Sequence, residues 1–372
     1  MIRSVAAALG LVIGFLATVP SPAQRKKKEK EEVTQTLEVL PDPPPVVTAN
    51  VERLQFHIAP LSSQGLLSRQ TRDAVRALLR QTGRAQPVRL RAFVAGTGDM
   101  RRVQTIVSEE YLDRHMAFPS VSVVQVGQLP AEGAQVLIES ISAARKPVNP
   151  AGLAFISGQA ASHKDPHHPI APLLDKSLSD LKTAVAAIEA SPADVLRVSC
   201  FLSSLERHAD LHVKAKTAFP TAVLTLLQVQ RAPFSAIAEC EAVARLKTRP
   251  KAALEMLNPD GLSKSPNYSQ IALLAPGRVA LSGTQMAFRF QDSDVRLAFD
   301  RLKKVLEGAK TSMRSVAMSN IYPLTGGIAE RVRAIRFEYY DKSRPPASTM
   351  LPFEGLPSLD ASFGVDVISV IE

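Results

Sequence analysis

The sequence has no tryptophan and only two cysteines, Cys200 and Cys240. Two thiols cannot build a framework of several disulfides, and they cannot supply the four ligands of a structural zinc site. Both cysteines fall in segments that are expected to be strands. They could pair in an oxidising compartment, or they could stay buried as free thiols, because the geometry for a bridge is demanding. The sequence leaves these two alternatives open.

The chain also lacks a concentrated basic stripe, although its net charge is +10, and aromatic residues make up only 5% of it. Proteins that bind nucleic acids usually combine a basic face with aromatic side chains on which bases stack. The most basic run, at 25–28, is followed at once by acidic residues. We therefore expect no nucleic-acid partner.

No apolar run reaches the ~20 residues that a membrane-spanning helix needs. The apolar stretch at 5–19 follows a positively charged start and leads to small residues that end at Ala23. This pattern predicts a signal peptide over 1–23 that is cleaved near Ala23, and hence a periplasmic or secreted protein without a stable membrane anchor. An uncleaved N-terminal anchor is the alternative. Residues 24–50 are rich in charge and proline, which predicts a disordered linker.

Three segments of the remaining chain repeat one order of elements. In each, an amphipathic helix precedes a strand, and a turn, a strand, a second turn and a closing strand follow. Polar or proline-rich stretches separate the segments, so we expect domains at 51–145, 150–247 and 262–372. Each one predicts an α+β fold, a mixed sheet with two helices on one face.

Several of the expected strands carry adjacent apolar residues, such as Val123-Val124 and Leu226-Leu227. Neighbouring side chains of a strand point to opposite faces, so these strands should be buried on both sides. Their own helices can cover only one face. The sheets must therefore pack against something else.

The residues of two turns and one strand carry a family resemblance. The segments GLAFISGQ at 152–159 and PGRVALSGTQ at 276–285 resemble the strand and Ser-Gly-Gln turn of the Rid family (reactive intermediate deaminase, YjgF-type, also labelled endoribonuclease L-PSP). VLRVSCFLS at 195–203 is similar to the central strand of that family. The resemblance implies a chorismate-mutase-like fold that assembles as a trimer with ligand clefts between subunits. Three copies in one chain then imply an intrachain pseudo-trimer that is monomeric as a whole.

The resemblance also implies where chemistry would take place. In the family, an arginine beside the penultimate strand holds the carboxylate of an imine substrate, but the matching positions here are Val121, Ala222 and Ser348. An acid that orients water toward the C=N carbon would match Glu139, Glu241 and Asp366. The alternative is that these are strand-end carboxylates without a catalytic role.

Two Ser-Gly pairs complete the candidate site. The resemblance places Ser157, Gly158, Ser282 and Gly283 beside the ligand clefts, although such pairs often only form turns. Histidines at 163–168 lie in a loop without a fixed scaffold, so we expect no metal site, and nothing in the sequence calls for a cofactor.

The missing arginine favours a degenerate small-molecule-binding protein with ligands in the clefts between copies. The alternative is an enamine/imine deaminase that uses Glu241 or Asp366 together with another anchor for its substrate. Endoribonuclease activity of the L-PSP type is a third hypothesis, and it rests on the family label alone.

Overall fold

A computed structural model describes residues 40–372. The predicted signal peptide and most of the predicted linker lie outside these residues. The prediction of disorder is wrong at the end of the linker, because Val46–Asn50 forms strand β1. This strand pairs antiparallel with β12 (Arg278–Ser282), a partner so distant along the chain that no local pattern reveals it.

The first sheet is four-stranded, in the order β2-β5-β3-β4. The central strand β3 pairs in parallel with β4 and antiparallel with the closing strand β5. The elements of this part are a 3-10 helix at Val51–Arg53, β2 (Leu54–Ile58), α1 (Leu67–Thr82), β3 (Gln86–Ala95), α2 (Arg101–Leu112), β4 (Ser120–Val126) and β5 (Val136–Ala143).

The second sheet repeats this order as β6-β9-β7-β8, and β10 and β11 extend it beyond β6. Its parallel pair is again the central strand with the strand that follows the second helix. The elements are β6 (Leu153–His163), α3 (Ile170–Ala187), a 3-10 helix at Pro192–Asp194, β7 (Val195–Leu202), α4 (His208–Ala218), β8 (Val223–Gln228), β9 (Ala236–Arg245), β10 (Leu254–Leu257) and β11 (Ile271–Leu274).

The third sheet has the same core order, β12-β16-β14-β15, with β1 added beside β12 and β13 paired to β16. The elements are β12, β13 (Gln285–Phe288), α5 (Asp292–Gly308), a 3-10 helix at Met313–Ser315, β14 (Val316–Pro323), α6 (Gly326–Ile335), a 3-10 helix at Arg336–Glu338, β15 (Ala347–Met350) and β16 (Ala361–Ile371). The predicted α+β class with mixed sheets is confirmed.

Two strands join a sheet that belongs to a different predicted segment of the chain. β1 precedes residue 51 but belongs to the third sheet, and β11 falls within 262–372 but pairs with β6 of the second. The sheets therefore interlock across the boundaries that the sequence predicts.

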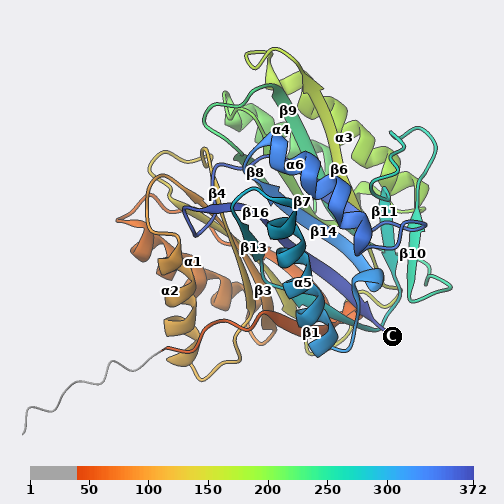
Figure 1. Cartoon of the computed structure of the whole chain (residues 1–372), viewed down its shortest axis with the longest axis horizontal. Helices are drawn as coiled ribbons and strands as arrows, with labels where there is room; N and C mark the ends of the chain where they lie inside the picture. The colour runs from red at the N-terminus through yellow and green to blue at the C-terminus, as the bar shows by residue number, and fades with distance from the viewer. Residues whose placement is uncertain (1–39) are drawn as a thin grey trace, which may run out of the picture. The chain divides into compact units, whose positions relative to one another are not determined.

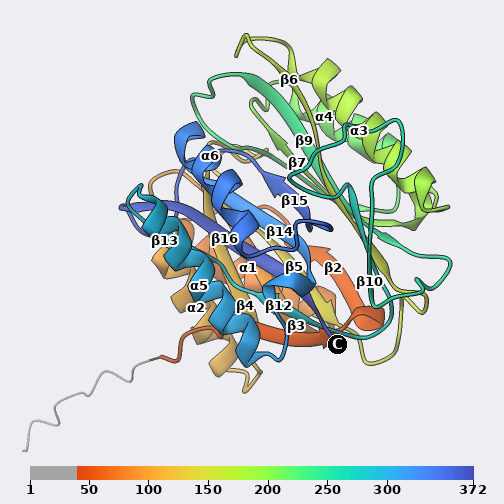
Figure 2. The ribbon, with the colours of Figure 1, turned by 45° about the vertical axis from the view of Figure 1, so that its right-hand side comes forward.

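The helices form three pairs, α1/α2, α3/α4 and α5/α6 (Figures 1 and 2). Each pair packs an apolar stripe on its own sheet, as Leu174, Leu178 and Leu181 of α3 do. Two further core clusters combine residues of all three sheets. Both faces of each sheet are thus buried, which explains the adjacent apolar residues of the strands.

Aromatic rings mark the place where the three sheets meet. Phe93, Phe201 and Tyr322 occupy equivalent positions in the three central strands. Each lies two residues after the residue that pairs with Glu139, Glu241 or Asp366 of the closing strand. The rings of Phe93 and Phe201 lie 6.0 Å apart, and Phe353 contacts both Phe201, at 5.6 Å, and Tyr322, at 5.2 Å. None of the helices in residues 40–372 combines the length and apolar character needed to cross a membrane.

Candidate functional site: a buried ionic ring and a polar cleft

The three candidate acids occupy equivalent positions on the closing strands. Glu139, Glu241 and Asp366 lie directly opposite Arg91, Ser199 and Asn320 of the central strands. All three carboxylates are buried. Their neighbours therefore decide what they can do.

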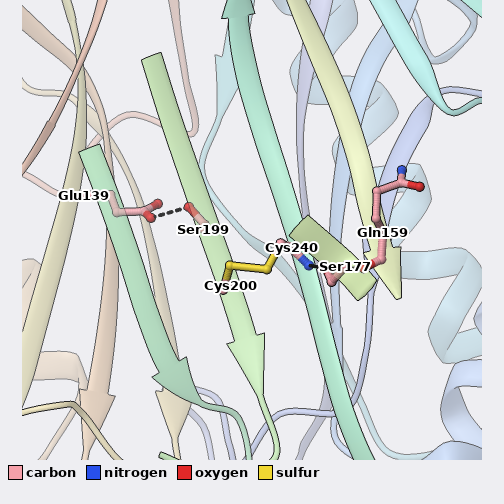
Figure 3. Close-up of a disulfide and its surroundings, with 6 residues drawn as sticks. All are labelled: Glu139, Gln159, Ser177, Ser199, Cys200 and Cys240. Carbon is pink, nitrogen blue, oxygen red and sulfur yellow. Dashed lines mark hydrogen bonds between the residues drawn. A yellow bond between two sulfur atoms is a disulfide. The ribbon is translucent and has the colours of Figure 1, made fainter. Parts of the chain in front are cut away.

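Glu139 reaches from the first sheet to the second. Its carboxylate accepts hydrogen bonds from Ser199 Oγ and Thr225 Oγ1, both at 2.6 Å, and it is paired with the Arg91 guanidinium at 2.7 Å. Figure 3 shows the bond to Ser199. Burial alone would raise the pKa of Glu139, but Arg91 and Arg197 and the two hydroxyl donors outweigh it and lower that pKa to about 2.

Glu241 reaches from the second sheet to the third in the same way. It accepts from Asn320 Nδ2 and Thr349 Oγ1, each at 2.7 Å, and pairs with Arg91 at 2.8 Å and Arg197 at 3.3 Å. Burial opposes ionisation, yet these arginines lower the pKa of Glu241 below its ordinary value.

Asp366 completes the circuit from the third sheet back to the first. It pairs with Arg89 and accepts from Ser122 Oγ at 2.7 Å, while Tyr322 OH donates to it at 2.9 Å. We call the three acids with Arg89, Arg91 and Arg197 the ionic ring. Its bonds run head to tail between the sheets, and its carboxylates are already occupied by donors from the protein. A water-orienting role for them stays a prediction.

The two predicted Ser-Gly pairs have different surroundings. Ser157 is buried, where its Oγ donates to Ser269 O at 2.6 Å and accepts from Ser348 N at 2.8 Å. Ser282 accepts from Val367 N at 2.9 Å. A Cβ on Gly283 would lie 2.7 Å from Val121 O, so this glycine permits tight packing of the third part on the first.

Gly158 lines a cavity of about 340 Å³, which we call the Glu239 cleft. Three parts of the chain build it: the second sheet, the segment before β11, and the α6–β15 region. The lining residues are Gly158, Ala160, Glu239, Ser265, Asn267, Tyr268, Arg333, Arg336, Ser348 and Met350.

Glu239 is the acid of this cleft, and it is 6% exposed. Burial raises its pKa to about 8, with the charge of Glu241 adding to the effect, while the Met350 amide and Arg333 act against it. The carboxyl group therefore carries its proton at neutral pH and can donate a hydrogen bond.

Arg336 is the most buried cation of the cleft, with 2% exposure. Its Nη2 donates to Asn267 O at 2.6 Å, and within residues 40–372 its Nε has no hydrogen-bond partner. No carboxylate of the described chain lies within 4.0 Å of it. Burial lowers the pKa of Arg336 to about 10, so it stays charged at neutral pH. Arg333, more exposed, pairs with Glu330.

The sequence does not single out the acid of the cleft, because this acid occurs in one copy only. The residues at the register position of Glu239 are Leu137 in β5 and Gly364 in β16. The signal that could have revealed it is local, since Glu239 precedes Glu241 by two residues and shares its face of the strand.

Cys200 and Cys240 form a disulfide, which decides between the two alternatives that the sequence left open (Figure 3). They lie directly opposite each other in the β7–β9 register, and both are fully buried. The disulfide joins the central strand β7 to the closing strand β9. In β9, Cys240 lies between Glu239 of the cleft and Glu241 of the ionic ring.

The histidine loop offers no metal centre. The rings of His163 and His168 stack at 4.1 Å, and Asp165 Oδ1 accepts from the His167 amide at 2.9 Å. Across residues 40–372, no three His, Cys, Asp or Glu side chains are grouped so that they could hold a metal ion.

No protein-family profile and no curated protein matches this sequence. Solved structures of Rid and YjgF proteins do resemble it over part of its length. A Rid-family protein of unknown function from Yersinia pestis is 15% identical and covers 32% of this chain and 99% of its own, with a TM-score of 0.28. A YjgF-family protein from Mycobacterium tuberculosis is 24% identical and covers 27% and 81%, with a TM-score of 0.22. One from Neisseria meningitidis is 12% identical and covers 32% and 95%, with a TM-score of 0.24. Over about a third of its length, this chain resembles the Rid/YjgF structures.

Proposed function

We propose that this chain is an exported, Rid-like pseudo-trimer that binds a small anionic molecule in the Glu239 cleft. The recurrence of one strand order in three sheets supports three copies of one unit. The bonding of the ionic ring supports a closed threefold arrangement. The acid of each sheet accepts hydrogen bonds from the next sheet, from the first to the second, the second to the third and the third back to the first.

The observation that carries the proposed ligand chemistry is the buried Arg336 without a carboxylate partner. A buried guanidinium is costly unless it is paired and hydrogen-bonded. A carboxylate or similar anion in the cleft would supply that partner and would satisfy its Nε. Arg333, at the more exposed side of the same cavity, would add a second positive charge.

Arg336 would then replace the arginine that is missing from the penultimate strands. The strand registers place Leu224, and not Ala222 as the sequence match suggests, at the position of Val121 and Ser348. Arg336 reaches the cleft from the end of α6 instead of from the penultimate strand. The protonated Glu239 would donate a hydrogen bond to an acceptor on the ligand. One cleft, rather than three, would carry this pair of groups, since Leu137 and Gly364 stand at the other two acid positions.

The second candidate function is hydrolysis of an enamine or imine, with Glu239 rather than Glu241 or Asp366 as its acid. The raised pKa of Glu239 favours it, because a group that is protonated at neutral pH can pass a proton to a leaving nitrogen. Among the described residues, no observation adds support for RNA cleavage.

Calorimetric titration of the 24–372 chain with small 2-oxo acids tests the binding proposal. Wild-type protein should bind at least one of them, Arg336→Met should weaken that binding about tenfold or more, and Arg278→Met, on an exposed arginine outside the cleft, should leave it unchanged. Equal affinities for all three proteins would overturn the proposed anchor. Hydrolysis of freshly generated 2-iminopropanoate by wild type but not by Glu239→Gln would establish the enzymatic alternative.

A further inference from the structure

A second cavity lies between the first and second sheets, at the junction that corresponds to the Glu239 cleft. Its volume is about 480 Å³, within the range of small-molecule sites. We call it the apolar cleft. Its lining residues are Ile58, Ala59, Leu61, Pro130, Leu137, His208, Ala209, His212, Val213, Leu224 and Leu226.

The strand registers show that the two cavities occupy the same place in the repeated fold. Leu137 lies opposite Phe93 just as Glu239 lies opposite Phe201. Leu137 therefore stands where the other cleft has its acid.

The strand beside the second helix shows the same exchange. Ser122, Thr225 and Thr349 are the equivalent donors of the ionic ring, so Leu224 and Leu226 hold the positions of Ser348 and Met350. The helix α4 supplies histidines where α6 and its end supply arginines.

The lining of the apolar cleft disfavours charged ligands. The lining has no Asp, Glu, Lys or Arg, so a charged ligand would lose its hydration without gaining an ion pair. An uncharged apolar molecule would instead bury its surface against aliphatic side chains. The polar side chains of the lining are the imidazoles of His208 and His212, one turn apart on α4 and both exposed at the mouth.

We propose that the apolar cleft is a second binding site, for an uncharged and mainly hydrophobic small molecule with a polar group toward His208 and His212. Val213 is 63% exposed beside these histidines, so the apolar lining continues to the surface and leaves the ligand a way in. The site does not depend on the ligand of the Glu239 cleft. The repeated junction thus carries two chemistries, one for anions and one for neutral apolar compounds.

Titration with N-phenyl-1-naphthylamine, an uncharged dye whose fluorescence rises in apolar surroundings, tests this site. The 24–372 chain should give a saturable rise with one dye bound per chain. Ala209→Phe places a ring on an exposed helix residue that lines the cavity, and it should weaken dye binding about tenfold or more. Ala334→Phe, at an exposed residue of α6, is the matched control and should bind the dye as wild type does.

Two further measurements make the result specific. Leu224→Ser should also weaken dye binding. When the dye is added to wild type, the methyl NMR signals that shift should be confined to Leu137, Leu224, Leu226 and their neighbours. Glu239→Gln and Arg336→Met should leave dye binding unchanged, which separates this site from the anion cleft. A wild-type titration without saturation, or equal dye affinity in Ala209→Phe and Ala334→Phe, would overturn the proposal.

Discussion

The carboxyl group of Glu239 packs so closely against Gly158 that a methyl group on Gly158 would displace it. A Cβ built on Gly158 would lie 2.0 Å from Oε1 of Glu239, well inside the van der Waals distance. The glycine of the first Ser-Gly turn thus makes room for the cleft carboxyl group, and its role is steric rather than conformational.

Gly158→Ala should therefore move Glu239 and destabilise the protein by about 1–3 kcal/mol, the usual cost of overpacking. Gly308→Ala is the control, because nothing lies within 4 Å of a Cβ at that helical glycine and alanine favours a helix. Chemical denaturation of both variants measures the difference. Equal stabilities would show that the cleft tolerates the methyl group.

The raised pKa of Glu239 predicts that the protein loses stability as pH rises from about 4.5 to about 8. The unfolded carboxyl group titrates near 4.5, whereas the folded one holds its proton up to about pH 8. The folded state thus binds more protons between these values, so the free energy of unfolding should fall as pH rises from 4.5 through 8. Denaturation of wild type and Glu239→Gln across this range checks it. The glutamine variant should lack this part of the decrease.

The ionic ring predicts a strong effect of removing one cation. Arg91→Met removes the closer of the two cations that Glu139 and Glu241 share, Arg197 being the other, and the loss should be about 3–5 kcal/mol. Arg101→Met removes an exposed pair with Asp99 and should leave the stability nearly unchanged. Urea midpoints of the two variants give the comparison. A loss in Arg91→Met as small as that in Arg101→Met would contradict a structural role for the ring.

Glu139 should respond to acid in the opposite sense to Glu239. Its pKa is lowered to about 2 in the fold, so the stability it contributes is complete above pH 4.5 and is lost as pH falls toward 2. Glu139→Gln should flatten the acid limb of the stability curve. Thermal denaturation between pH 2 and 5 measures that limb, and an unchanged slope would argue against the proposed ionisation state.

The buried disulfide predicts slow reduction in the native state. Its sulfurs have no access to solvent, so a thiol reductant should act only after unfolding exposes them. Replacing both cysteines by alanine opens a loop of 40 residues and should cost roughly 4 kcal/mol. Thiol trapping measures the rate of disulfide reduction in native buffer and in denaturant, and the rate in native buffer should be much lower.

The sequence predicted the mixed α+β units because their signals are local. Apolar spacing marks α3 and α5, and proline turns bracket the strands β8 and β9. It also placed Glu139, Glu241 and Asp366 at one equivalent position, because their order relative to the turns is preserved. The placement of β1 beside β12 could not be predicted, since β-pairing depends on partners that lie far apart in the chain.

The candidate site was harder to predict, because its chemistry depends on which copy faces which. The sequence leaves open whether the three acids are catalytic or only strand-end carboxylates, because their partners lie on other sheets. Arg89, Arg91 and Arg197 lie on strands where nothing in the sequence indicates ion pairing. The role of Arg336 could not be predicted, because it depends on the burial of this arginine beside Glu239, which belongs to another sheet.

The pairing of β1 with β12 also sets an order of events. The residues of β1 leave the ribosome among the first of the folded part, yet their partner strand is made more than two hundred residues later. The strand β1 therefore stays without its sheet partner until β12 has been synthesised. A growing chain can complete its first sheet early, because the strands of that sheet all lie within residues 54–143, but its third sheet closes only when β1 meets β12 and β12 meets β16.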